Sequence, residues 1–101
     1  MGPEKKIGTV ELDGEILNIV ETFYADGKTT AILVEDEQGS PYATLSYNMG
    51  KDVPLAPGQI VVKAYAENAP VANAILATGL FKKQGSFPFN NVVMDVWAKV
   101  A

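Results

Sequence analysis

The sequence predicts an α+β fold: a mainly antiparallel sheet of about six strands, of which the first four form a meander, with one short helix packed on it. Three polar or glycine-containing turn segments divide the first half into strand-like runs, at residues 13–14, 25–28 and 36–40. One apolar run, 68–79, has residues at its two ends that are typical of helix start and stop signals. The 101 residues fit one domain, 1–101, with a single core.

The first half of the chain predicts the meander. Segments 6–12 and 15–24 are strand-like and flank Asp13-Gly14, a pair that favours a type I′ turn because both residues tolerate positive φ. Segment 29–35 places apolar residues on both faces, which predicts a central strand. Residues 41–48 then predict the fourth strand.

The second half predicts a connection, a strand, a helix and a closing strand. Residues 50–58 hold two prolines and two glycines and predict an extended connection. A fifth strand is predicted at 60–65. For the helix we expect Asn68 as N-cap, Pro70 in the first turn, Gly79 as the left-handed residue after the end, and Leu80 packed back on Ile75 in a Schellman-type ending.

Residues 81–91, with Gly85, Pro88 and three phenylalanines, predict a loop with apolar anchors. Residues 92–100 alternate and predict a last strand, inside the sheet or along its edge. An edge at 6–12 or 92–100 offers a surface for a homodimer.

Charge limits the partners. The chain has twelve acidic residues and eight basic ones, all lysine, which gives a net charge of −4. A chain without arginine lacks the planar fork that suits phosphate and base recognition, so we expect no direct nucleic-acid binding. No apolar run has the length of a membrane span or signal peptide, and cysteine is absent. We expect a cytoplasmic protein without membrane contact.

Most enzyme mechanisms are disfavoured because the residue types that they need are missing from the sequence. Without histidine or cysteine the chain has no imidazole base, no thiol nucleophile and no usual zinc ligand set. A serine–lysine dyad would need Ser86 with Lys82 or Lys83, or Ser46 with Lys63. These serines and lysines are interpreted equally well as ordinary polar residues of the surface. We expect no enzyme, no cofactor and no metal.

The stretch VEDEQGSPYATLSY places three carboxylates beside a turn. It lacks the spaced ligands and distal glutamate of a calcium loop, which favours a solvated hairpin tip. An acidic contact surface is the other interpretation, in which carboxylates around two turns meet a lysine- and arginine-rich groove of a partner protein. The candidate residues are Glu11, Asp13, Glu15, Glu35, Asp36 and Glu37.

The aromatic residues allow two interpretations. They either fill the sheet faces or form an exposed platform for a flat ligand or for single-stranded nucleic acid, and the acidic, arginine-free composition argues against the nucleic acid. The residues concerned are Tyr24, Tyr42, Tyr47, Tyr65 and Trp97. A small-ligand binder would need a concave apolar pocket, for which we expect a position near Tyr65, Phe81 and Phe89.

About the last 60 residues resemble a known family. The matching elements are "YATL" at 42–45, Asn48, "VK" at 62–63, "EN" at 67–68, "GLF" at 79–81 and the closing strand at 93–97. They resemble a family of small uncharacterised proteins encoded on bacterial conjugative elements, plasmids and phages. Members often carry "TG" after the "GLF" step, where this chain has Gln84-Gly85.

The resemblance transfers no catalytic residue, because the family has no established active site. It implies a mobile genetic element as the setting. It therefore implies a protein-binding inhibitor of a host defence system, of anti-CRISPR or anti-restriction type. The alternatives are a ligand-sequestering protein and an accessory protein of the element.

Overall fold

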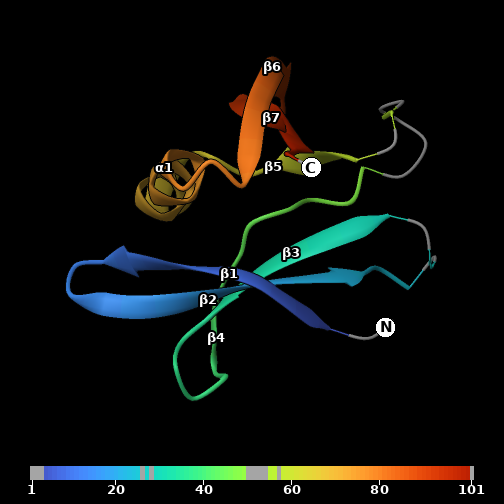
Figure 1. The fold of residues 1–101 in the computed structure, drawn as a ribbon. Helices are drawn as coiled ribbons and strands as arrows, with labels where there is room; N and C mark the ends of the chain where they lie inside the picture. Colours follow the sequence, from blue (N-terminus) through green and yellow to red (C-terminus); the bar gives the residue numbers. More distant parts are fainter. Residues whose placement is uncertain (1–3, 26, 28, 50–54, 57, 101) are drawn as a thin grey trace.

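The computed structural model describes residues 4–25, 27, 29–49, 55–56 and 58–100. These residues form two antiparallel sheets and one α-helix (Figure 1). The first sheet has the order β1-β2-β3-β4, with strands Lys5–Leu12, Glu15–Phe23, Thr30–Glu35 and Pro41–Thr44. The second has the order β5-β7-β6, with strands Gln59–Val62, Val92–Lys99 and Phe81–Phe89.

The α+β class and the four-stranded meander are confirmed. Asp13 and Gly14 have φ of 53° and 78°, so both occupy the left-handed region that a type I′ turn requires. β3 lies between β2 and β4, in the predicted central position. The strand count is wrong, because the described residues contain seven strands in two sheets. The predicted turn at 25–28 and connection at 50–58 fall partly or mostly outside the described residues.

The fourth strand is shorter than predicted because the chain passes from one sheet to the other. The Leu45 N–H donates to the Ile32 carbonyl of β3 at 3.0 Å, while the Leu45 carbonyl accepts from the Lys63 N–H at 2.9 Å. The Tyr47 N–H donates to the Val61 carbonyl of β5 at 2.9 Å. Residues 45–47 therefore join the two sheets through backbone hydrogen bonds.

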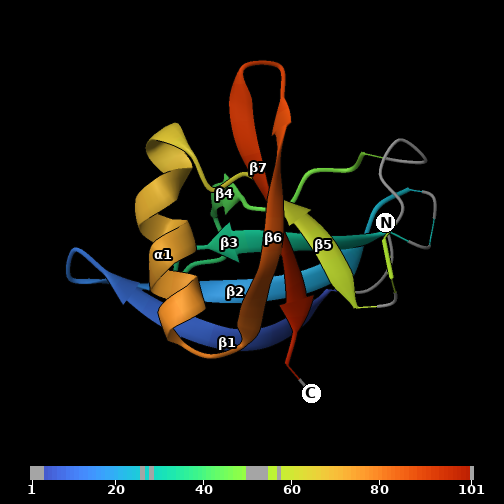
Figure 2. The same cartoon turned by 90° about the horizontal axis from the view of Figure 1, so that it is seen from above.

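The main core lies between the two layers. Seen from above in Figure 2, β6 and β7 run across the strands of the first sheet, and the helix α1 lies beside them. Phe81 and Trp97 pack at a ring-centroid distance of 5.7 Å. The core also contains Leu17, Ile19, Ile32, Val34, Leu45, Ile60, Val62, Val71 and Ile75. A smaller cluster around Met49, Val61 and Met94 covers the other face of the second sheet.

The prediction of a loop at 81–91 is wrong, because residues 81–89 form β6. The pairing with β7 shifts register between Lys83 and Gly85, which absorbs the glycine in a bulge. β6 lies at the edge of its sheet, where Pro88 needs no outward N–H partner. Asn90 and Asn91, with φ of 49° and 66°, close the hairpin. β7 is therefore interior, so the dimer edge predicted at 92–100 is wrong as well.

The helix begins differently from the prediction. A 3-10 turn, Ala66–Asn68, precedes α1, Ala69–Ala77. Asn68 is the N-cap residue by position, but its backbone is already helical and its side chain makes no capping bond. Its Nδ2 donates instead to the Thr44 carbonyl of β4 at 3.3 Å. The side chain thus connects the start of the helix to the first sheet.

The helix end follows the prediction in part. Gly79 has the expected left-handed conformation, with φ of 82°. Its N–H donates to the Leu76 carbonyl at 3.2 Å, which is one of the two Schellman hydrogen bonds. The Leu80 N–H donates instead to Thr78 Oγ1 at 3.2 Å. The threonine hydroxyl takes the place of the second helix carbonyl.

Candidate protein-binding surface

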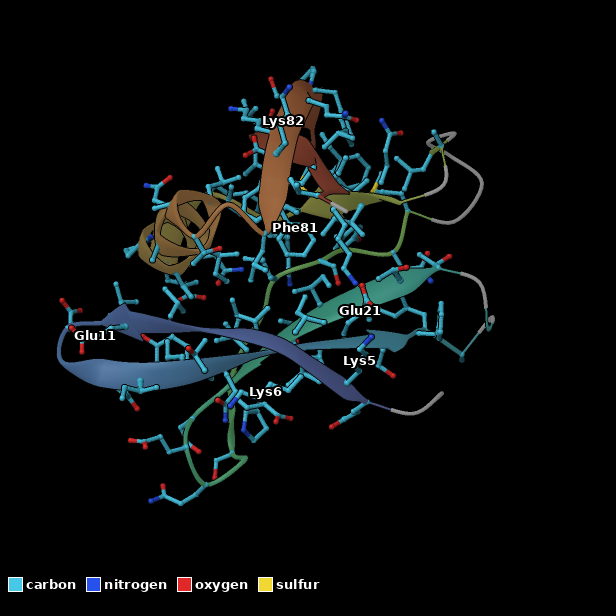
Figure 3. All side chains as sticks on the ribbon, viewed as in Figure 1. Lys5, Lys6, Glu11, Glu21, Phe81 and Lys82 are labelled. Carbon is cyan, nitrogen blue, oxygen red and sulfur yellow. The ribbon has the colours of Figure 1, made fainter. Side chains whose placement is uncertain are left out.

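The six acidic candidates lie around two turns at the same end of the first sheet, because alternate turns of an antiparallel meander share an end. Figure 3 shows Glu11 beside the β1–β2 turn. The structure does not place all six on one face. Glu11 pairs with Ile16 and Leu12 pairs with Glu15, so Glu11 and Glu15 point to opposite faces.

Glu11 and Glu35 share the outer face, the one directed away from the second sheet. Asn18 of β2 pairs with Thr9 of β1 and with Glu35 of β3, which places all three on this face. Ile16, two residues before Asn18, shares the face, whereas the intervening Leu17 is buried in the core. The side chain of Ile16 is 43% exposed. We call Glu11, Ile16, Asn18 and Glu35 the outer-face surface.

The same face changes charge along its length. Lys6 pairs with Val20 and therefore lies on the outer face, towards the end opposite the two turns. Val20 beside Lys6 is buried, as are Thr22 and Ala31, which lie farther from the two turns. The two carboxylates of the outer-face surface therefore lie at the turn end, away from Lys6.

Asp36 has a structural role in the β3–β4 turn. Its Oδ1 accepts hydrogen bonds from the backbone N–H groups of Gln38, at 3.0 Å, and Ser40, at 2.9 Å. The arrangement is that of an Asx turn, in which the carboxylate replaces backbone acceptors. Glu37 and Asp13 are exposed at their turns. Among the described residues, no group of three or more acidic side chains is arranged to hold a metal ion.

The aromatic residues do not form one platform. Trp97 is fully buried, and Tyr24 is half-buried with its hydroxyl 2.8 Å from Ser46 Oγ. Burial raises the pKa of Tyr24, and the hydrogen bond with Ser46 offsets part of that rise. Tyr42 and Tyr47 are exposed, and the ring of Tyr47 lies 6.0 Å from that of Phe89.

The proposed serine–lysine dyad of Ser46 with Lys63 is not formed. Ser46 Oγ accepts a hydrogen bond from the Ile32 N–H at 2.8 Å and pairs with the Tyr24 hydroxyl. Both contacts are within the fold, and Ser46 is only 2% exposed. This serine therefore serves the packing of β3 against the crossing segment.

An open cleft adjoins β4. It has a volume of about 440 Å³. It does not correspond to the predicted pocket, because Phe81 is buried in the main core whereas Tyr65 and Phe89 border the second cluster. The residues that line the cleft are Tyr42, Ala43, Thr44, Lys63, Glu67 and Asn68.

Sequence reasoning missed Ile16 and the cleft. The alternation in β2 carried a signal for Ile16, since a strand that buries Leu17 and Ile19 must turn Ile16 outwards. The cleft had no local signal, because its two walls are 19 or more residues apart along the chain.

The comparisons with known proteins return no match: no protein-family model, no curated protein and no solved structure matches this chain. Within the described ranges, no helix has the length and apolar character needed to cross a membrane.

Proposed function

We propose that the protein acts by stoichiometric binding to another protein, without a reaction of its own, through the outer-face surface. The observation that carries the proposal is the exposure of Ile16 between Glu11 and Glu35. The solvated face of an antiparallel sheet is normally polar, and Ile16 places an apolar side chain there beside the carboxylate of Glu11. An apolar centre with a polar rim is the common anatomy of protein–protein contacts.

The charge of this surface favours a basic partner. Asp13 and Glu37 extend the rim beyond Glu11 and Glu35, and the chain as a whole carries a net charge of −4. Complementary charge accelerates encounter and makes association sensitive to salt. In the setting that the family resemblance implies, the partner is a defence component of the bacterial host, bound at its lysine- and arginine-rich nucleic-acid surface.

Affinity capture tests the proposal. The tagged protein is incubated with lysate from bacteria that carry several defence systems, and the bound proteins are identified by mass spectrometry at low and moderate salt. We expect one stoichiometric component whose recovery falls with salt. Ile16→Ser and the double variant Glu11→Lys, Glu35→Lys should each weaken its binding by roughly tenfold or more.

Glu4→Lys supplies the matched control, because Glu4 is exposed and lies before β1, away from the turn end. It changes the net charge by the same amount as one of the two reversals. Equal binding by the wild type and both outer-face variants would contradict the proposed surface, whatever the partner is.

A further inference from the structure

The edge of β4 differs from the other edges that the structure describes. β6 carries Lys82, Lys83 and Pro88, residues that discourage the pairing of a further strand. β1 is interrupted by a register shift between Lys6 and Gly8. A Cβ placed on Gly8 would lie 2.6 Å from Leu80 Cδ1, so Leu80 packs closely against the inner face of β1 beside this irregularity. β4 faces the open cleft.

The backbone of β4 presents hydrogen-bonding groups to this cleft. The Leu45 N–H donates to Ile32 in β3, and the direction of these groups alternates along a strand, so the N–H and carbonyl of Thr44 face away from β3. Among the described residues, the Thr44 carbonyl accepts one long side-chain hydrogen bond, from Asn68 Nδ2 at 3.3 Å. A neighbouring strand can replace that donor with a backbone N–H.

Carboxylates lie at both ends of the β4 edge. Glu37 is exposed in the turn that leads into the start of the strand. Glu67 is exposed at the other end, where it lines the cleft. The cleft also contains Lys63, whose Nζ lies 6.0 Å from the ring centroid of Tyr47. Within the cleft Glu67 balances Lys63, and Glu37 in the adjoining turn adds one further carboxylate, so the edge as a whole has a small excess of negative charge that favours a basic occupant.

We propose that the β4 edge binds an extended, lysine- or arginine-containing segment of the partner protein as an additional strand. The inference rests on the proposed function, since it gives the basic partner a second point of contact. Backbone groups of the segment pair with Thr44, and its basic side chains reach Glu67 and Glu37. Tyr42, which is 46% exposed, offers its ring to one of these cations.

A peptide titration followed by NMR tests this mode of binding. The probe is an eight-residue peptide of alternating lysine and valine, added to the ¹⁵N-labelled protein, with a peptide of alternating glutamate and valine as the charge control. We expect amide shifts concentrated at 42–44 and 66–68 with the lysine peptide, and none with the glutamate peptide. Thr44→Pro and Glu67→Lys should each weaken binding by roughly tenfold, whereas Glu4→Lys should leave it nearly unchanged.

Glu67→Lys keeps the test decisive if Thr44→Pro disturbs the fold, because Glu67 is exposed and its replacement leaves the core intact. Equal binding of the two peptides, or no binding of the lysine peptide, would overturn the inference. Shifts centred on Glu11 and Ile16 would also overturn it, while leaving the proposed function standing. Conversely, if the outer-face variants capture the partner as well as the wild type does, the outer-face surface is not the binding site. The peptide titration at the β4 edge would still stand as a separate result.

Discussion

Among single residues, every buried side-chain nitrogen and oxygen of the described chain has a hydrogen-bond partner. Asp95 lies in the interior of the second sheet, where its Oδ2 accepts a hydrogen bond from Trp97 Nε1 at 3.1 Å. Lys83 Nζ lies 3.5 Å from Asp95 Oδ1. The carboxylate therefore provides the acceptor that the largest core side chain requires.

Asp95→Ala should lower the free energy of unfolding by about 1–3 kcal/mol, because it leaves the buried Trp97 N–H without its acceptor. Asp95→Asn retains an acceptor oxygen and should cost less. Urea denaturation followed by tryptophan fluorescence measures both. A larger cost for asparagine than for alanine would contradict this role of the carboxylate.

Ala66 is a non-glycine residue in the left-handed region, with φ of 52°. A Cβ in that region costs roughly 1–2 kcal/mol, so Ala66→Gly should raise the free energy of unfolding by up to about 1 kcal/mol after the entropy of glycine is counted. Ala69→Gly, at a helical φ of −57° in the first position of α1, should lower it by up to about 1 kcal/mol. Urea denaturation of the two variants should show shifts of opposite sign, and two shifts of the same sign would count against the assigned strain.

Tyr24 should make stability fall at high pH. Its folded pKa is raised by burial, so above about pH 10 the unfolded chain loses this proton before the folded chain does. The stability from the neutral phenol is present below the unfolded pKa and is lost as the pH rises through the folded pKa. Tyr24→Phe should remove that part of the decline, whereas Tyr42→Phe, at an exposed position, should keep it. Urea midpoints between pH 8 and 11 give the comparison.

At the scale of elements, local signals predicted what local interactions decide. Asp13-Gly14 specified its turn, and Gly79 specified the end of the helix. β6 was missed because Gly85 and Pro88 indicate a loop, unless the strand is known to bulge and to lie at an edge. Asn90-Asn91 was the overlooked hairpin signal, since asparagine tolerates the left-handed region. The end of β4 depends on pairing with β5, which no local pattern reveals.

Hydrogen exchange should separate the strands of the second sheet. β7 pairs with β5 on one side and with β6 on the other. Its backbone N–H groups therefore donate hydrogen bonds to a neighbouring strand on whichever side of β7 they point. We expect the slowest exchange at residues 94–97, and fast exchange at alternate amides of β6, whose outer edge is open. Uniform protection along β6 would indicate that this edge is covered, for instance by a second copy of the chain.

At the scale of the whole molecule, the crossing segment 45–47 and the ion pair of Lys99 with Glu21, at 3.2 Å, both connect the two layers. The ion pair is partly exposed and should contribute less than about 1 kcal/mol, so the crossing segment and the core hold the layers together. The acidic turns were predictable from the sequence. The opposite faces of Glu11 and Glu15 also follow from the two-residue turn, because that turn pairs Leu12 with Glu15 and Glu11 with Ile16.

The most direct measurement is a map of the contact between the protein and its captured partner. The partner, unlabelled, is added to the ¹⁵N-labelled protein, and the amide signals that shift or broaden are assigned. We expect effects centred on Glu11, Ile16, Asn18 and Glu35 of the outer face, weakened by Ile16→Ser. Effects confined to the β6–β7 hairpin, with the outer face unchanged, would contradict it.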